Sequence, residues 1–554
     1  MVGVDPGSMN LKSERIAALP IVNAYLRKLG IAEMLSERVE SSGRFPASLS
    51  LMLILRNIIL QREPMYALAE WANSHSPSLL ELQPHQLGSI NDDRPGRALD
   101  LLYDADRGSM MTLMAIRAIK DFHVSTQEFH NDSTTITLSG DYHDADGSQK
   151  REKDSIEITH GHNKDHRPDL KQILWALTVS SDHSVPVHYM AMDGNTGDSD
   201  THIAIWDSLA RIAGSPDFIY VADSKLCTRS NMKHIADHGG RFITVLPASR
   251  SESAWMREYM QYHDLTWKDA FTRKDRREDI EFKVLDSPIP SAEGYRIIWV
   301  WSSQKEDLDA KVRDSAIREA VSKLDRLHAT LSQRRMKKGM VIRHADEAVT
   351  GVPYVSFAIE ESRHPIYRKS GRGRPTPETG YKKTIETRYQ VSWQIRSDLI
   401  EKDSRADGIF PLFTNCDPDP ADVLAKYKYQ PMLEKRHEQL KSVYRIAPVL
   451  FKNVERIEAF LFLYFIAMLV QALIERDLRM SMKRAEIESL PIYSEERECS
   501  SPTAYRVFSQ FENVEAHHLL IEGKEIRRFY TELSIIQKMI LSLLGIPAEE
   551  FEPE

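Results

Sequence analysis

The feature that most constrains this chain is a nearly uninterrupted apolar segment, AFLFLYFIAMLVQALI, at residues 459–474. A helix needs about 20 apolar residues to cross a bilayer. This segment is shorter, contains Gln471, and is bordered by Glu458 and Glu475. We therefore expect a buried core helix, which requires a large domain around it. The N-terminal residues lack a basic stretch followed by an apolar one, so we expect no signal peptide there.

The composition is typical of a globular protein with several domains. The length of 554 residues allows about three to four domains, and a hydrophobic content of 42% excludes wholesale disorder. A net charge of -8 argues against a protein that coats nucleic acid through its overall charge, but it permits local basic patches. Three dispersed cysteines, Cys227, Cys416 and Cys499, exclude a disulfide framework and a cysteine zinc site. They predict a reducing, cytoplasmic location.

The hydrophobic pattern changes along the chain. Apolar residues recur at helical spacing near both ends of the chain. Between these ends, predicted strands alternate with a predicted helix, as in a mixed α/β core. A further part contains strands, a charged helix at 305–335 and a basic segment at 363–388. The apolar stripe of that helix consists of Ile317, Ala320, Leu324, Leu327 and Leu331. We predict five regions with boundaries at residues 1–122, 123–250, 251–415, 416–480 and 481–554.

Two aspartates lie at the edges of predicted strands. Asp132 opens the strand DSTTITL, and Asp223 closes the strand FIYVAD. Strand ends of one sheet can bring such side chains together, and converging carboxylates are the ligands that Mg²⁺ prefers. Taken alone, each aspartate is better explained as a turn or cap residue.

A third acid lies in the segment AKYKYQPMLEKRHEQLKS. Its offsets place Tyr427, Gln430, Glu434 and Lys441 near one face of a helix. The simpler alternative is an ordinary amphipathic helix with a charged face. Pro431 lacks an amide hydrogen and clashes with the preceding turn, so we expect the helix to kink or begin there.

At these residues the chain resembles a known family. The spacing Tyr427-x2-Gln430-x3-Glu434-x6-Lys441 is similar to the Y-x2-R-x3-E-x6-K signature of DDE transposases in the insertion-sequence-4 superfamily. Further blocks resemble those of its insertion-sequence-1634-like branch, in the same order. These blocks are residues 131–140, 161–172, 221–232 and 454–476. The ordered combination is specific, whereas any single block is not.

The resemblance implies an α/β fold. An RNase H-like catalytic core, with a mixed sheet flanked by helices, would be interrupted by a β-rich insertion domain at 251–415 and accompanied by helical N- and C-terminal regions. Asp132, Asp223 and Glu434 would be the catalytic acids and would hold Mg²⁺, for which Mn²⁺ could substitute.

The resemblance also implies an activity. It is Mg²⁺-dependent cleavage of DNA at the terminal inverted repeats of an insertion sequence, followed by strand transfer into target DNA by two-metal phosphoryl transfer. A homodimer would carry it out, since each of the two ends needs an active site. The implied location is the bacterial cytoplasm, in association with the nucleoid.

Two departures from the family pattern affect contacts and leave the acids intact. Gln430 stands where the broad signature has Arg, which removes a charge-assisted contact to phosphate. Ser224 and Lys225 follow Asp223 in place of the Arg-Gly-Tyr of the wider superfamily.

Several residues are candidate DNA contacts. Near the acids, Tyr427, Gln430 and Lys441 would position the DNA backbone. Basic residues of two other segments would contribute further contacts, in agreement with the preference of Arg for narrow grooves. They are Lys164, Arg167, Lys171, Arg368, Lys369, Arg372 and Arg374.

Three alternatives remain open from the sequence. The chain could be a catalytically silent, DNA-binding descendant of a transposase, which an intact set of acids disfavours. It could be an RNase H-like nuclease that cleaves DNA without strand transfer. A helical scaffold protein is also compatible with the composition, but it leaves the four ordered blocks unexplained.

Overall fold

The computed structural model describes residues 9–41, 45–91, 93–274, 278–443, 452–493, 495 and 497–553. The chain forms two compact units. Unit 1 consists of residues 1–244 and 425–554, and unit 2 consists of residues 245–424. Both combine helices with strands, so the fold is mixed α/β. The five regions proposed from the sequence remain a prediction.

Helices account for most of the N-terminal part of unit 1. These are α1 (Leu19–Lys28), α2 (Ile31–Arg38), α3 (Ala47–Leu60), α4 (Leu68–Asn73), α5 (Pro84–Leu87), α6 (Asp93–Asp104) and α7 (Arg107–Asp121). Helices also follow residue 415, and these are α14 (Pro420–Tyr427), α15 (Gln430–Glu438), α16 (Val454–Arg484), α17 (Ala504–Ser509) and α18 (Ile535–Leu544).

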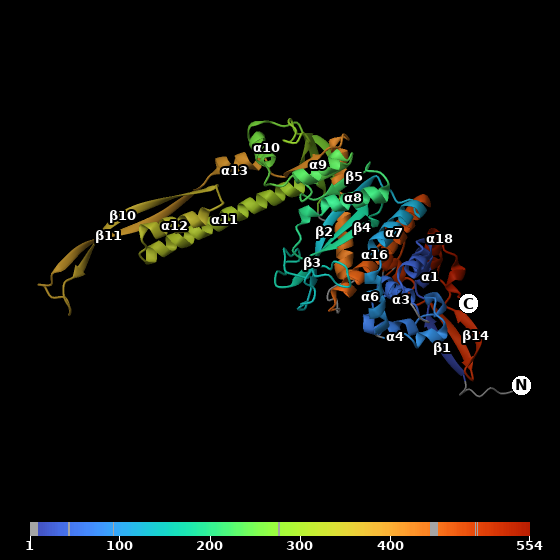
Figure 1. The fold of residues 1–554 in the computed structure, drawn as a ribbon. Helices are drawn as coiled ribbons and strands as arrows, with labels where there is room; N and C mark the ends of the chain where they lie inside the picture. Colours follow the sequence, from blue (N-terminus) through green and yellow to red (C-terminus); the bar gives the residue numbers. More distant parts are fainter. Residues whose placement is uncertain are drawn as a thin grey trace. The chain divides into compact units, whose positions relative to one another are not determined.

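Helix α16 contains the apolar segment of residues 459–474. Within the described residues it is the one helix long and apolar enough to cross a membrane, yet 89% of its most apolar stretch is buried inside the protein. It packs against α1, α3, α6 and α18 and against strand β4 (Pro186–Met192) (Figure 1). The prediction of a buried core helix is confirmed.

The sheet of unit 1 has the strand order β4-β3-β2-β5-β6. Its other strands are β2 (Glu128–Leu138), β3 (Lys171–Ser180), β5 (Ile219–Ala222) and β6 (Arg241–Val245). Strands β2, β3 and β4 pair antiparallel, whereas β2, β5 and β6 pair parallel. The parallel pairs require crossover connections. These contain α8 (His202–Ala213) between β4 and β5, and α9 (Arg229–Asp237) between β5 and β6.

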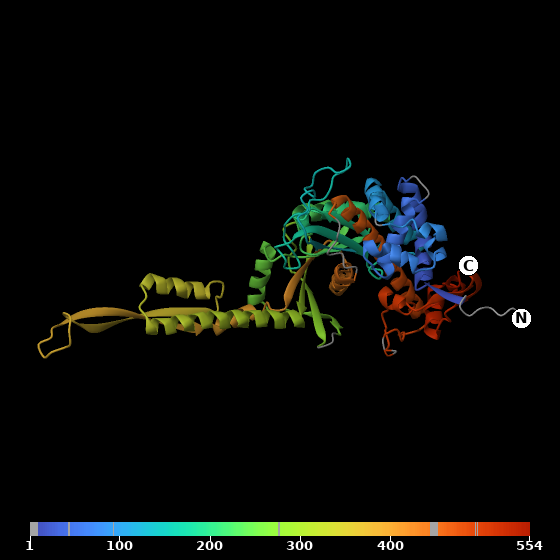
Figure 2. The ribbon, with the colours of Figure 1, turned by 90° about the horizontal axis from the view of Figure 1, so that it is seen from below.

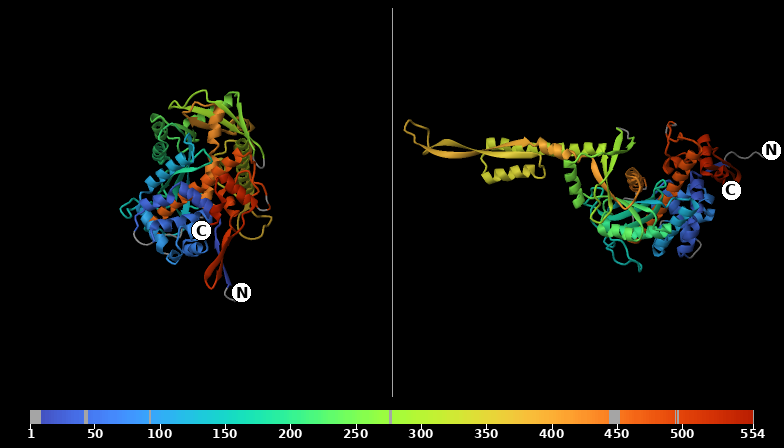
Figure 3. Two further views of the ribbon diagram at one scale, coloured as in Figure 1. Left: turned by 90° about the vertical axis from the view of Figure 1, so that its right-hand side faces the viewer. Right: turned by 90° about the horizontal axis from the view of Figure 1, so that it is seen from above.

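Two terminal segments correct the expectation of purely helical ends. β1 (Met9–Arg15) pairs with β13 (Glu515–Ile521), which pairs with β14 (Lys524–Tyr530), all antiparallel (Figure 3). Glu522 and Gly523 join β13 to β14 with φ values of 51° and 77°. Such a two-residue turn with positive φ favours a hairpin over a helix, and β1 acquires its partner only from the other end of the chain.

Unit 2 contains an antiparallel sheet with the order β12-β9-β8-β7. Its strands are β7 (Lys268–Arg273), β8 (Ile280–Asp286), β9 (Arg296–Ser302) and β12 (Ile409–Thr414). Its helices are α10 (Ser251–Tyr262), α11 (Ser303–Gln333), α12 (Lys338–Val349) and α13 (Ser397–Ser404). Strands and helices are both extensive here, with 31 residues in α11 alone, and the β-rich insertion domain stays a prediction.

Helix α11 packs through the predicted apolar stripe. Its buried residues are Ile317, Ala320, Leu324, Leu327 and Leu331, which confirms that prediction. They form a core with α12 and with the two-stranded ribbon of β10 (Val355–Lys369) and β11 (Tyr381–Ile395). Most of the basic segment 363–388 is thus a paired hairpin. Figure 2 shows the ribbon continuing beyond both helices to its tip.

Candidate active site

Asp132 and Asp223 lie next to each other in the sheet of unit 1. Strands β2 and β5 pair in parallel, with Asn131 opposite Ala222, so the next position along each strand is an aspartate. Asp132 is still within β2, whereas Asp223 follows the last residue of the shorter β5. The hydroxyl of Thr244 donates a hydrogen bond to the carbonyl of Asp223 at 2.5 Å and ties it to the end of β6.

Glu434 lies on α15, which packs against β2. The expected continuous helical face from Tyr427 to Lys441 is wrong. α14 ends at Tyr427, α15 begins at Gln430 with Pro431 in its first turn, and Lys441 belongs to a π-helical turn at Gln439–Val443. The proline is the cause, since it cannot continue the hydrogen bonding of a helix that precedes it. The expectation that a helix begins there is confirmed.

The carboxylate of Asp132 is under electrostatic strain. Burial raises its pKa to about 6, and the negative charges of Asp223 and Glu434 act in the same direction. The nearby Lys164 opposes this shift, as does the amide of Ser133, which donates to Oδ1 of Asp132 at 2.8 Å. The three acids are therefore close enough for their charges to interact.

Tyr427 lies near these acids, and Gln430 begins the helix that carries Glu434. Burial raises the pKa of Tyr427 to about 12, and the charges of Asp223, Asp132 and Glu434 contribute. The Nε2 atom of Gln430 is buried and makes no hydrogen bond among the described residues. Tyr427 therefore lies near the acids, and Gln430, at the start of the helix that carries Glu434, has a donor unused among the described residues.

Two lysines also border the site. Lys164 donates to the carbonyl and the hydroxyl of Ser133 at 2.7 and 2.8 Å. Lys441 forms an ion pair with Asp165 at 2.6 Å. Both lysines lower the pKa of the neighbouring His437, so they lie near Asp132, which His437 contacts.

The other predicted contact residues lie elsewhere. Arg167 pairs with Asp169 at 2.8 Å on the surface, and Lys171 donates to the carbonyl of Asp141. The remaining four belong to unit 2, where they occupy the distal end of the β10–β11 ribbon. They are Arg368, Lys369, Arg372 and Arg374.

His437 is a site residue that the sequence interpretation missed. Its Nε2 atom lies 3.7 Å from Oδ2 of Asp132, and the residue is only 6% exposed. Burial lowers its pKa to about 3, and the charges of Lys441 and Lys164 act in the same direction. A signal for it exists, because residues three apart on a helix share a face and His437 follows Glu434 by three.

The connections that hold α14 and α15 against the sheet were also missed. Glu128 on β2 accepts from Lys426 at 2.6 Å and pairs with His130 at 2.7 Å. Tyr429, between the two helices, stacks near His130, with ring centroids 4.8 Å apart. Its hydroxyl hydrogen bonds to that of Ser184 at 2.9 Å. These contacts fix the start of α15, and with it the direction of Glu434.

Arg436 connects α15 to its surroundings on the other side. Its Nε donates to the carbonyl of Ser184 at 3.1 Å, and its Nη2 pairs with Glu475 of α16 at 2.9 Å. Both charged side chains are almost fully buried. α15 is therefore fixed by buried polar contacts on the side of α16 as well as on the side of the sheet.

The donor chemistry of the acids fits a hard divalent cation. Three carboxylates supply oxygen ligands of the kind that Mg²⁺ prefers, and their mutual repulsion would be relieved by a positive charge. As they stand, no three His, Cys, Asp or Glu side chains of the described residues form a ready metal cluster. The exposed Glu434 has the rotamer freedom to approach the two aspartates.

Comparison with known proteins gives one family match and weak structural similarities. A family model described as a domain of unknown function (DUF4277) matches residues 11–116. No curated protein matches the chain. A solved structure of a piggyBac transposase synaptic complex with hairpin DNA is similar at 9% identity and a TM-score of 0.34, over 97% of this chain and 80% of that chain.

Two Mos1 transposase structures are similar over shorter stretches. One is a pre-cleavage transpososome, at 9% identity and a TM-score of 0.15, over 39% of this chain and 64% of that chain. The other is a paired-end complex with the left transposon end, at 10% identity and a TM-score of 0.15, over 41% and 75%. TM-scores this low do not establish a common fold, so the proposals below rest on the residues of this chain.

Proposed function

We propose that this chain is a DNA transposase of the DDE class, which cleaves the ends of an insertion sequence and joins them to target DNA. The observation that carries the proposal is the register of β2 and β5, which makes Asp132 and Asp223 neighbours, together with Glu434 on the helix packed against β2. These are the three acids that the sequence resemblance singled out, brought together from segments 91 and 211 residues apart.

We further propose that the sheet of unit 1 is an RNase H-like core. In chain order, the sheet has three strands that pair antiparallel, β2, β3 and β4, followed by two that pair parallel, β5 and β6. One acid lies on the first of these strands, one directly after the fourth, and one on a helix later in the chain. This order supports the proposal. Unit 2 would then be the insertion domain, since its residues interrupt the chain between β6 and the helix that carries Glu434.

Asp132, Asp223 and Glu434 would hold Mg²⁺, or Mn²⁺ in its place, which would supply charge neutralisation at the scissile phosphate. The surrounding residues of this chain bind and orient the DNA. Lys441 is held by Asp165 and can exchange that partner for a phosphate. Tyr427 would present a hydroxyl near the acids, and Gln430 an amide donor at the start of α15, to a backbone passing there.

The distal β10–β11 ribbon would be a second DNA contact. Cross-strand pairs such as Arg368–Lys382 and Tyr367–Lys383 place basic side chains along it. Tyr367 and Tyr381 are exposed by 60% and 54%. A two-stranded ribbon fits the major groove of DNA, and interleaved basic and aromatic side chains suit its backbone and bases. We expect the Arg372→Ala, Arg374→Ala double variant to reduce the salt dependence of DNA binding by about two phosphate contacts.

The decisive experiment uses purified full-length protein, Mg²⁺ and a duplex copied from the DNA on either side of the gene. We expect end-specific nicking and joining, lost on Asp132→Ala, Asp223→Ala or Glu434→Ala with DNA binding retained. Asp237→Ala is the matched control, because this exposed acid on α9 pairs only with Lys233 among the described contacts. It should leave both reactions unchanged.

Each other outcome favours a named alternative. Tight binding without cleavage by the unsubstituted protein would favour a silent DNA-binding descendant. Cleavage without joining would favour a nuclease. Cleavage that survives Glu434→Ala would contradict the assignment of the third acid. The proposed homodimer predicts two chains per pair of ends, which sedimentation of the DNA complex measures.

A further inference from the structure

His437 has an unusual environment for a buried histidine. It is 6% exposed, and among the described residues neither ring nitrogen makes a well-aligned hydrogen bond. A buried polar group without such a bond carries a free-energy cost, because its lost hydration is not replaced. On α15 the buried Arg436 is paired, whereas the unpaired buried atoms among the described residues belong to Gln430 and to His437, the residue beside Asp132. A site that retains such a cost commonly uses the group for function.

The two oxygens of the Asp132 carboxylate have different neighbours. Oδ1 accepts a hydrogen bond from the amide of Ser133 at 2.8 Å. Oδ2 faces Nε2 of His437 at 3.7 Å. One oxygen is therefore fixed by the backbone of β2, and the other faces His437. The same turn of α15 carries Glu434, which shares the face of His437.

We propose that His437 is the positioning residue for Asp132, fixing its carboxylate through a hydrogen bond from Nε2 to Oδ2 that closes when the site is loaded. The inference rests on the proposed function and adds the group that orients its first acid. Hydrogen bonds at unloaded sites are often long and tighten only in the reacting complex.

Two variants separate positioning from mere packing. His437→Leu fills a similar volume without a donor, and His437→Gln retains an N–H donor at similar reach. If the ring only fills space, leucine replaces it better than glutamine. If the ring positions Asp132, glutamine replaces it better, and the difference appears in metal affinity. Loss of such orienting groups typically weakens metal affinity about 10- to 100-fold.

The test measures bound Mn²⁺ from the loss of its free electron paramagnetic resonance signal, using full-length protein with the flanking-DNA duplex. We expect His437→Leu to weaken Mn²⁺ affinity about 10- to 100-fold and His437→Gln to recover most of it. His188→Leu is the control, because His188 is equally buried in β4 and lies outside the site. It should leave Mn²⁺ affinity unchanged, while thermal unfolding of all three variants reports any general loss of stability.

Unchanged Mn²⁺ affinity in His437→Leu, or an equal loss in His437→Gln, would overturn the inference. If the unsubstituted protein binds Mn²⁺ through the three acids in that case, the proposed function stands and only the role of His437 fails. If the unsubstituted protein binds no Mn²⁺, the proposed function and the inference fail together.

Discussion

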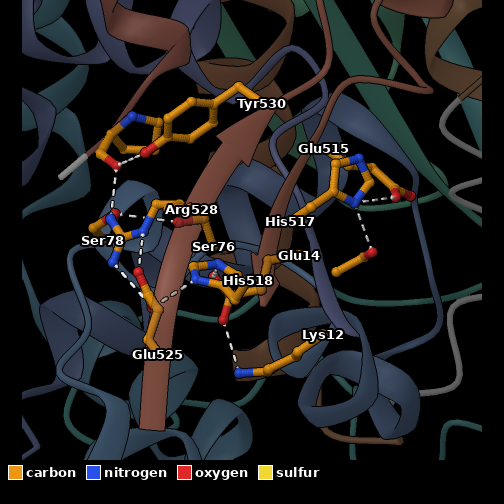
Figure 4. Close-up of polar contacts among 12 residues, drawn as sticks. Lys12, Glu14, Ser76, Ser78, Glu515, His517, His518, Glu525, Arg528 and Tyr530 are labelled. Atoms are coloured by element: carbon orange, nitrogen blue, oxygen red, sulfur yellow. Dashed lines mark hydrogen bonds and ion pairs between the residues drawn. The ribbon is translucent and has the colours of Figure 1, made fainter. Parts of the chain in front are cut away.

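Two regions of unit 1 place a histidine beside at least one carboxylate, and they differ in how charge is balanced. One region is the three-stranded sheet of β1, β13 and β14, called the small sheet below. In it, His518 lies 2.8 Å from Glu525 and 3.4 Å from Glu14. Lys12 pairs with Glu14, and Arg528 pairs with Glu525 (Figure 4). Each acid of this network therefore has a basic partner of its own.

The candidate active site has the opposite balance. Its acids repel one another, and burial together with this repulsion raises the pKa of Asp132 to about 6. In the small sheet, the hydrogen bonds from Arg528 and His518 lower the pKa of Glu525. The small sheet thus uses charge to join the two ends of the chain. In the candidate active site the carboxylates repel one another, and a cation, or a DNA backbone bound with one, would relieve that repulsion.

The largest expected effect contrasts the acids of the two regions. Asp223→Asn should reduce DNA cleavage by about a thousandfold or more, the scale seen when one member of a catalytic group is removed. Glu525→Gln makes the same chemical change in the small sheet and should leave the cleavage rate within about twofold of the unsubstituted value, because surface pairs contribute little. Single-turnover cleavage measures both. Equal losses would mean that Asp223 has only a structural role.

The second contrast concerns stability and the buried pair of α15 and α16. Arg436→Met should lower the free energy of unfolding by about 3 kcal/mol, because it leaves Glu475 buried without its closest basic partner. Arg528→Met removes a partner of Glu525 in the small sheet, where both side chains are about one-third exposed. It should cost less than about 1 kcal/mol. Urea unfolding measures the stability of both variants, and similar losses would contradict the expected effect of burial.

Much of the site could be predicted from local patterns. Alternating Thr and Ile after Asp132, and the apolar run before Asp223, indicated strands bordered by acids. Both strands lie in the sheet, but β2 begins at Glu128 and so contains Asp132 in its interior. The stripe of α11 followed from helical spacing alone. These predictions succeed because the periodicity of a strand or helix is a property of neighbouring residues.

The remainder depends on contacts between distant residues. Nothing near β1 encodes its pairing with β13, whose Glu515 is the partner of Arg15. Helical spacing placed Tyr427 and Lys441 near one face of a helix, but α14 ends at Tyr427 and a new helix begins near Pro431, the break that the proline predicted. His437 was missed because its significance comes from Asp132, some 300 residues earlier in the chain. Packing, more than propensity, determines such positions.

The third contrast concerns pH in the absence of divalent metal. The raised pKa of Asp132 favours its protonated form in the folded state. The contribution of this proton to the free energy of unfolding is therefore complete below the ordinary pKa of 3.8 and is lost as pH rises through about 6. Asp132→Asn, neutral at every pH, should therefore be more stable than the unsubstituted protein by about 2–3 kcal/mol above pH 6. This advantage should vanish near pH 4.

Glu525 should behave in the opposite direction. Its lowered pKa stabilises the fold above its ordinary range and loses that effect as pH falls through the folded value. Glu525→Gln should therefore be the less stable protein at neutral pH and should approach the unsubstituted one in acid. Thermal unfolding in a metal chelator across pH 4–8 measures both variants. Shifts of the same sign would refute the assigned charge balance.

The smallest contrast compares two lysines that each pair with one acid. Lys441 pairs with Asp165 at 2.6 Å beside the candidate active site, and Lys12 pairs with Glu14 at 2.8 Å in the small sheet. Both lysines are partly exposed, so Lys441→Met and Lys12→Met should each cost less than about 1 kcal/mol of stability.

Their effects on DNA binding should differ, because only Lys441 borders the acids. Lys441→Met should weaken binding and lower the slope of log affinity against log salt by about 1, the loss of one phosphate contact, while Lys12→Met should change neither. Fluorescence anisotropy at several salt concentrations measures the slope. An unchanged slope in Lys441→Met would mean that Asp165 keeps this lysine when DNA binds, and that the ion pair is as structural as the one in the small sheet.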